Sequence, residues 1–184
     1  MRRGEQMRRL CNNILASGGN RERCIEDVVV LPIVEELLDI SGRAWKKDNI
    51  KTYLEIPCEL AVRADSGQLQ QVLLNLLINA RHALHTQGGT LRVSAQPQQN
   101  RIAIAVSDNG PGIAPDVLSR IFEPFFTTKV DGDANASKGA GLGLHVSRDL
   151  VAGMNGELTV ESTLGQGATF TIMLPPADTQ PLNE

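Results

Sequence analysis

The sequence predicts an α+β fold, a two-layer sandwich in which helices cover one face of a mixed or antiparallel sheet. Residues 31–40 and 68–84 carry apolar side chains at helical spacing. Residues 90–95 and 101–106 alternate apolar and polar side chains, which is typical of strands with one buried face. Helices and strand pairs follow one another in the order α, ββ, α, ββ, loops, α, ββ, and this order favours one layer of each kind.

The composition indicates a single domain and argues against several kinds of site. The chain has 184 residues, 41% of them apolar, which suits one core. A net charge of −3 and an aromatic content of 3% offer no basic or stacking platform for nucleic acid. The three cysteines form no C-x-x-C pair, so we expect reduced thiols rather than a zinc site or disulfide framework. No apolar run is long enough for a bilayer, and we expect a cytoplasmic location, with any membrane anchor in other sequence of the parent.

Before residue 90, three local signals mark the ends of the predicted elements. Gly18 and Gly19 end a helical pattern, Pro32 lies in the first turn of another, and Asp65 supplies N-cap chemistry. We therefore expect a helix end and linker within residues 1–24, a helix starting at Leu31, strands at 52–56 and 60–64, and a helix from residue 66 to about His85.

After residue 90, glycines separate the remaining elements. Asn155 and Gly156 end a helical pattern, and Gly165, Gln166 and Gly167 form a turn. We expect a strand pair at 90–95 and 101–106 joined through 96–100, a helix at 142–154, and an antiparallel pair at 157–161 and 168–174. The polar stretch 130–138 is expected to form a lid that is disordered without ligand, and residues 176–184 a disordered tail.

Two asparagines on the predicted helix 68–84 need polar partners. Asn75 and Asn79 lie four residues apart on one face of an otherwise apolar helix. A buried amide without partners costs roughly 1 to 3 kcal/mol, so both side chains are expected to be paired. A neighbouring backbone group and a hydrated Mg²⁺ with its phosphates are equally reasonable partners, because Mg²⁺ takes few protein oxygens and keeps several waters.

A second cluster follows the strand 101–106 directly. Asp108 stands where the strand ends, and Gly110 and Gly112 permit close approach of the backbone to a flat ligand. The carboxylate can accept a hydrogen bond from the exocyclic amine of adenine while Ile113 packs on the ring. A tight turn capped by Asp108 is the commoner explanation of this pattern taken alone.

Two further segments favour a phosphate site without proving one. Residues 139–144 form a glycine-rich entry to a helix, which leaves backbone N–H groups free for phosphate oxygens. No strand precedes this segment closely, so a dinucleotide-binding Rossmann motif is excluded. Residues 122–129 place apolar anchors before two threonines and Lys129, which suits the base of a lid whose lysine meets a phosphate; a small satellite core with a solvated lysine is the simpler alternative.

Together the four clusters resemble the GHKL (Bergerat) ATP-binding family. The segments NLLINA, DNGPGI, FEPFFTTK and GAGLGL match its N, G1, F and G2 boxes in order, and GQGATF follows. The resemblance covers roughly residues 29–175, within a domain expected at 25–175. It implies ATP and Mg²⁺ as cofactors, Asn79 as the metal ligand, Asp108 as the adenine reader with help from Thr169, and no catalytic side chain. The implied nucleotide site comprises Asn75, Asn79, His82, Asp108, Gly110, Gly112, Ile113, Phe125, Thr128, Lys129, Gly139, Ala140, Gly141, Leu142, Gly143, Leu144 and Thr169.

Within that family, the sequence resembles sensor histidine kinases of the nitrogen-regulatory and oxygen-sensing kind. Relatives that hydrolyse ATP or phosphorylate serine carry a glutamate base where Asn75 stands, and an amide cannot remove a proton. A neutral imidazole already offers a lone pair, so a histidine acceptor fits. His82, His85 and His145 lack the context of a phosphoacceptor, and residues 1–17 resemble the end of a dimerisation helix.

The resemblance therefore implies transfer of the γ-phosphoryl group of Mg-ATP to a histidine on the dimerisation domain of the same kinase, which is absent from this chain. A response regulator receiver domain is the implied downstream partner, with no nucleic acid and no direct membrane contact. The alternative is a regulatory module that binds nucleotide without transferring phosphate. Ala140 stands where kinases often have Ser or Thr, which removes one hydroxyl contact to phosphate.

Overall fold

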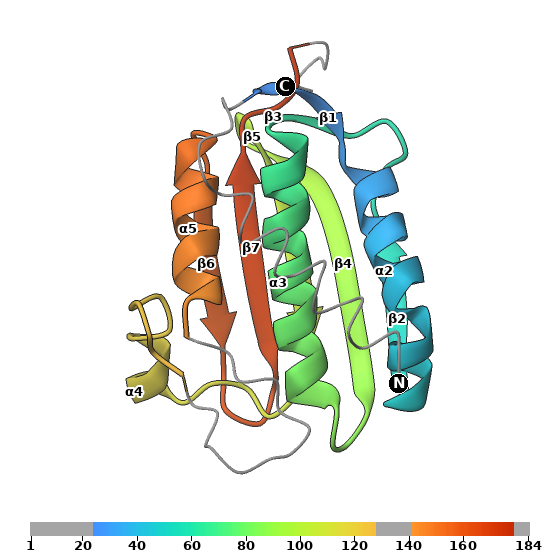
Figure 1. Cartoon of the computed structure of the whole chain (residues 1–184), viewed down its shortest axis with the longest axis vertical. Helices are drawn as coiled ribbons and strands as arrows, with labels where there is room; N and C mark the ends of the chain where they lie inside the picture. Colours follow the sequence, from blue (N-terminus) through green and yellow to red (C-terminus); the bar gives the residue numbers. More distant parts are fainter. Residues whose placement is uncertain (1–23, 128–140, 179–184) are drawn as a thin grey trace.

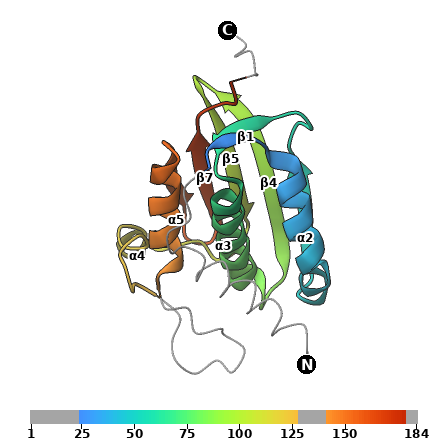
Figure 2. The same cartoon turned by 45° about the horizontal axis from the view of Figure 1, so that its top comes forward.

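The computed structural model describes residues 24–127 and 141–178. Its elements in chain order are β1 (Glu26–Val29), α2 (Val30–Lys47), β2 (Ile50–Glu55), β3 (Ala61–Ala64), α3 (Ser66–Leu84), β4 (Gly89–Gln98), β5 (Arg101–Asp108), α4 (Pro115–Leu118), α5 (Gly143–Gly153), β6 (Glu157–Ser162) and β7 (Ala168–Leu174). The helices α2, α3 and α5 lie side by side over one face of the sheet (Figures 1 and 2). This arrangement confirms the predicted α+β sandwich. Residues 1–23 of the predicted helix end and linker, and the predicted lid at 130–138, lie outside the described residues.

The main sheet has five strands in the order β2-β4-β5-β7-β6. Strands β2 and β4 are parallel, and the other neighbours are antiparallel, so the sheet is mixed as predicted. The strands expected at 52–56 and 60–64 belong to two different sheets, because β3 pairs with β1 in a separate two-stranded sheet. Strand β1 was not predicted; it is four residues long with one buried side chain, too short for a recognisable alternation.

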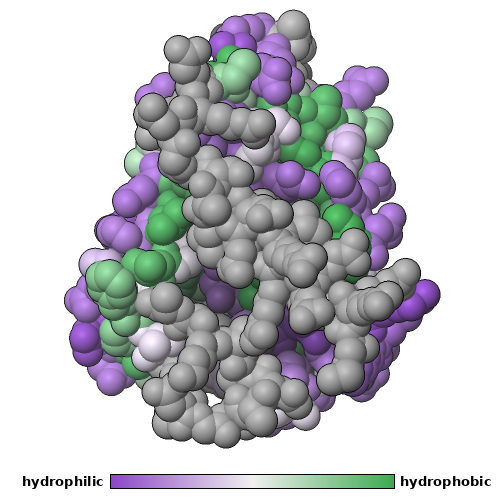
Figure 3. Space-filling model, in the orientation of Figure 1, coloured by the Kyte–Doolittle hydropathy of each residue, from purple (hydrophilic) through white to green (hydrophobic). Residues whose placement is uncertain are grey.

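The core lies between the helix layer and the sheet. In α3 the fully buried side chains include Leu69, Leu73, Leu76 and Leu77. Strand β7 alternates strictly, with buried residues at 168, 170, 172 and 174 and half-buried residues between them. Burying one large apolar side chain stabilises the fold by roughly 1.5 to 3 kcal/mol, so this interface fixes α3 on the sheet. On the coloured surface of Figure 3, apolar residues form separate patches among hydrophilic ones.

Both ends of the described chain are attached around β3. The Asp65 carboxylate caps α3 by accepting the Gln68 N–H at 2.9 Å, and its other oxygen accepts the Cys24 N–H at 3.1 Å. At the other end, Pro176 bridges to Val62, and the buried Ala177 donates its N–H to the Ala61 carbonyl at 3.1 Å. Disorder was expected from residue 176, but Pro176 and Ala177 make these backbone contacts; residues 179–184 lie outside the described part.

Candidate functional site

The elements that carry the described part of the predicted site meet at one end of the molecule, the lower end in Figure 1. Strand β5 ends there at Asp108, β7 begins there at Ala168, and α5 begins there at Gly143. Helix α3 runs towards the same end and contacts both β5 and α5. Segments far apart in the sequence therefore meet around one strand terminus.

Asp108 is a half-buried carboxylate at the end of β5. Its Oδ1 accepts the Gly110 N–H at 2.9 Å. Burial raises the pKa of Asp108, while hydrogen bonds from the backbone of Gly110 and Ala168 act in the opposite direction. A Cβ at Gly110 would lie 2.8 Å from that oxygen and 3.2 Å from the Ala83 Cβ of α3. The glycine thus lets the loop pass close to α3 without covering the carboxylate, which stays available to a hydrogen-bond donor.

Thr169 does not join Asp108, contrary to the expectation from the sequence. The strand register sets Asp108 opposite Ala168 and Ser107 opposite Thr169, and successive side chains in a strand face opposite sides of the sheet. The Thr169 hydroxyl accordingly donates to the Ser107 hydroxyl at 2.9 Å. Ala168, which sequence reasoning did not single out, is the residue that neighbours Asp108 on the helix side. Counting two-residue alternation from the buried Phe170 would have identified it.

The loop after Asp108 is held by the β6–β7 hairpin. Gly112 has φ 69°, and a Cβ there would lie 2.2 Å from the Thr163 carbonyl oxygen. The Pro111 carbonyl accepts the Gly165 N–H at 2.7 Å, and the Ser162 hydroxyl accepts the Ile113 N–H at 2.9 Å. The glycines of both segments were recognisable in the sequence, but their mutual contact was not.

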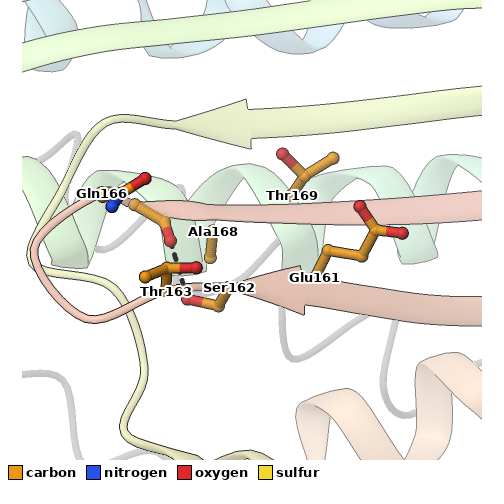
Figure 4. Close-up of a pocket in the computed structure, with 7 residues that line it drawn as sticks. Glu161, Ser162, Thr163, Gln166, Ala168 and Thr169 are labelled. Atoms are coloured by element: carbon orange, nitrogen blue, oxygen red, sulfur yellow. Dashed lines mark hydrogen bonds between the residues drawn. The ribbon is translucent and has the colours of Figure 1, made fainter.

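A pocket of about 180 Å³ opens in the same hairpin. Its lining is Glu161, Ser162, Thr163, Gln166, Gly167, Ala168 and Thr169. Figure 4 shows these side chains along the ends of β6 and β7, with Glu161 and Thr169 on neighbouring strands. Of the predicted site residues only Thr169 lines it, so the pocket lies beside the Asp108 cluster and is not its centre.

On α3 the two asparagines differ in their surroundings. The Asn75 amide donates to the Ser147 hydroxyl of α5 at 3.0 Å, and a Cβ at Gly143 would lie 2.4 Å from the Asn75 Oδ1. The partner of its NH₂ group is therefore a side chain, which the sequence did not indicate. The half-buried Asn79, one turn further on, makes no side-chain hydrogen bond to any residue in 24–127 or 141–178. His82 follows on the same face.

The start of α5 packs against the segment before the lid. Its N-cap residue is Leu142, with no side-chain cap, so first-turn N–H groups can meet an anion. Gly141 has φ 67°, and a Cβ there would lie 2.5 Å from the Phe125 carbonyl carbon. Phe125 itself has φ 64° and is 72% exposed, so its backbone contacts Gly141 while its ring faces solvent. Phe125 remains a predicted site residue.

The remaining predicted site residues either pack near the core or lie outside the described part of the chain. Leu144 packs against the core, and Leu142 is half-buried, whereas Ile113 packs against the core from the loop after β5. Thr128, Lys129, Gly139 and Ala140 lie outside the described residues. Ser147 and Ser162 are polar residues that sequence reasoning missed, because a serine among other polar residues gives no signal until its partner is known.

Comparisons with known proteins agree with this arrangement. The family described as "Histidine kinase-, DNA gyrase B-, and HSP90-like ATPase" matches residues 64–178. The two-component sensor PprA of Pseudomonas aeruginosa is 42% identical over 148 residues, 77% of this chain and 15% of that protein. The sensor histidine kinase ZraS of Salmonella typhimurium is 47% identical over 115 residues, 62% of this chain and 23% of that protein. The chain thus spans less than a quarter of the length of either relative.

Solved structures with a similar fold also come from histidine kinases. The catalytic domain of the histidine kinase ThkA superposes with a TM-score of 0.72 at 25% identity, over 84% of this chain and 97% of that one. Full-length ShkA in complex with AMPPNP superposes with a TM-score of 0.74 at 30% identity, over 89% of this chain and 33% of that one. In the described parts of this chain, no helix has the length and apolar character needed to cross a membrane. The chain belongs to the family of histidine kinase-, DNA gyrase B- and HSP90-like ATPases, within which its relatives in sequence and structure are sensor histidine kinases.

Proposed function

We propose that this chain binds Mg-ATP at the end of the sheet where Asp108 lies, and that it donates the γ-phosphoryl group to a histidine of its parent kinase. The observation that carries the proposal is the half-buried Asp108 carboxylate, kept open beside Gly110 and facing the α3 side of the sheet. It can accept a hydrogen bond from the exocyclic amine of adenine in a partly desolvated site, where such a bond discriminates between bases.

The phosphates would lie against the start of α5, whose first-turn N–H groups have no side-chain cap. Asn79 fits Mg²⁺, because its half-buried amide has no partner among the described residues and because this ion needs few protein oxygens beyond phosphate and water. When bound, the ion would neutralise phosphate charge. His82, Thr128, Lys129, Gly139 and Ala140 complete the proposed set by resemblance alone.

A histidine acceptor suits the surroundings of Asn75. The Asn75 amide is hydrogen-bonded to Ser147, and neither group can act as a base for water or serine. A neutral imidazole needs no such base. The proposed partners are the dimerisation domain that residues 1–24 would end, which holds the acceptor, and a receiver domain downstream. ATP as substrate places the reaction in the cytoplasm.

Transfer in trans tests the proposal. The chain is incubated with γ-labelled Mg-ATP and the parent's upstream helical domain, with Asp108→Asn as the control. We expect acid-labile, alkali-stable label on the helical domain, and its loss with the control, because an amide is a weaker acceptor than a carboxylate and its NH₂ group cannot accept from adenine. ATP binding without any label would instead favour a regulatory module that holds nucleotide, and absence of both would refute the proposed site.

A further inference from the structure

Ser162, the last residue of β6, connects the two loops that surround Asp108. Its hydroxyl oxygen accepts the Ile113 N–H at 2.9 Å, and its hydrogen is donated to the Gly167 carbonyl at 2.7 Å (Figure 4). Both partners are backbone groups, one in the loop after β5 and one at the start of β7. We infer that Ser162 is a positioning residue for base recognition, acting through the loop that carries Asp108 and Ile113; this inference rests on the proposed ATP site.

The hairpin contacts the chain at Asp108 and again in the loop that follows it. A Cβ at Gly167 would lie 1.9 Å from the Asp108 carbonyl oxygen, so the two backbones are in direct contact. Within the following loop, the Gly165 N–H donates to the Pro111 carbonyl, and Gly112 packs on Thr163. The Ser162 hydroxyl is the side-chain group that joins these two contacts, because it bonds to Gly167 and to Ile113 at once.

This geometry sets the distance between two recognition elements. Asp108 stays at the end of β5 because the sheet register holds it. Ile113 lies five residues later, and its backbone has the Ser162 hydroxyl as its partner. Without the hydroxyl, Ile113 loses its acceptor, and the gap for a flat base between Ile113 and Asp108 is no longer fixed. The expected consequence is poorer discrimination between bases, since guanine presents a carbonyl where adenine presents the amine that Asp108 accepts.

Three variants test this role in the 184-residue chain. Ser162→Ala removes both bonds, and Ser162→Thr keeps the hydroxyl. Ser107→Ala is the matched control, because it also removes one hydrogen-bonded serine hydroxyl near Asp108, but on the opposite face of the sheet, where its partner is Thr169. The measurements are dissociation constants for ATP and GTP and hydrogen exchange of the Ile113 amide without nucleotide.

We expect Ser162→Ala to weaken ATP binding by about fivefold to tenfold, with a smaller change for GTP and faster exchange at Ile113. Ser162→Thr should restore the wild-type ATP-to-GTP ratio, and Ser107→Ala should leave it unchanged. An equal loss for both nucleotides, or a wild-type ratio in Ser162→Ala, would overturn the positioning role. Failure of the wild-type chain to bind ATP would refute the proposed function itself, and this result differs from an unchanged ratio in a chain that binds.

Discussion

At the scale of single residues, the partial burial of Asp108 disfavours the charged form of its carboxyl group. Burial raises its pKa above the ordinary value of 3.8, and backbone hydrogen bonds from Gly110 and Ala168 only partly offset this effect. The fold therefore keeps an ionised group at some expense of stability. That is the expected pattern for a residue retained to bind something, since strain and desolvation concentrate at functional sites.

The pH dependence of stability follows from the sign of this shift. Because the folded pKa lies above 3.8, the stability that Asp108 contributes is fully present below pH 3.8 and is lost as the pH rises through the folded value. Asp108→Asn does not ionise. We expect its free energy of unfolding, relative to wild type, to increase between about pH 4 and pH 7. Urea denaturation across this range measures the difference, and parallel curves for the two proteins would contradict the assignment.

Gly112 is the second residue whose identity the structure dictates. Its φ of 69° and the 2.2 Å approach of a Cβ to the Thr163 oxygen predict that Gly112→Ala costs at least about 1 to 3 kcal/mol. Gly42→Ala is the control, because a Cβ at Gly42 in α2 meets nothing within 4 Å. That change should stabilise by about 0.5 to 1 kcal/mol, since alanine favours helix. Thermal unfolding of both variants measures whether each change lowers or raises stability. A stabilised Gly112→Ala would show that the loop adopts another path.

At the scale of elements, the contact between α3 and α5 explains why Asn75 tolerates its apolar surroundings. Ser147 is 2% exposed, and its hydroxyl is the acceptor for the Asn75 amide. The bond fixes where α5 begins relative to α3, and so where its first-turn N–H groups point. Asn75 would thus affect phosphate binding through the position of a helix as well as by direct contact.

A double-mutant cycle measures this connection. Ser147→Ala leaves a half-buried amide without its acceptor, and Asn75→Ala leaves a buried hydroxyl without its donor. We expect each single variant to lose about 1 to 2 kcal/mol and the coupling energy to be about 0.5 to 1.5 kcal/mol. Additive losses in urea denaturation would mean that the two side chains act independently.

Elements with regular periodicity could be predicted from the sequence, and those defined by their partners could not. Helix α3 and the β4–β5 and β6–β7 hairpins lie close to the predicted bounds, because local pattern and turn residues determine them. The parallel pairing of β2 with β4 depends on where α3 packs, which no local pattern encodes. Thr169 was assigned to Asp108 by resemblance, and only the strand register, set by β5 and β7 together, shows its hydroxyl on Ser107.

At the scale of the whole molecule, the two-stranded sheet closes the end opposite the candidate site. Strand β1 pairs with β3 along four residues and contributes Val28, which is 6% exposed. Arg63 of β3 forms ion pairs with Asp27 and Asp178, one near each end of the described chain. These exposed pairs are weak individually, so the ladder and the buried valine supply most of the stabilisation.

Truncation tests where the folded unit begins. A chain of residues 30–184 lacks β1, the buried Val28 and the Cys24 bond to Asp65, whereas a chain of residues 23–184 keeps all three. We expect the shorter chain to melt at least about 5 °C below the longer one. Equal melting temperatures would show that β1 belongs to the linker and not to the domain.

The first and last described segments are both attached around β3, so a rotation at this end of the domain is magnified at the other end. Helix α3 starts beside this attachment and runs its 19 residues towards the Asp108 end, a length of about 28 Å at roughly 1.5 Å per residue. A turn of about 10° at β1 would therefore carry the far end through an arc of about 5 Å, more than the length of a hydrogen bond. In the proposed kinase, a slight twist of an upstream segment would move a bound phosphate towards or away from its acceptor, while every contact inside the domain stays the same.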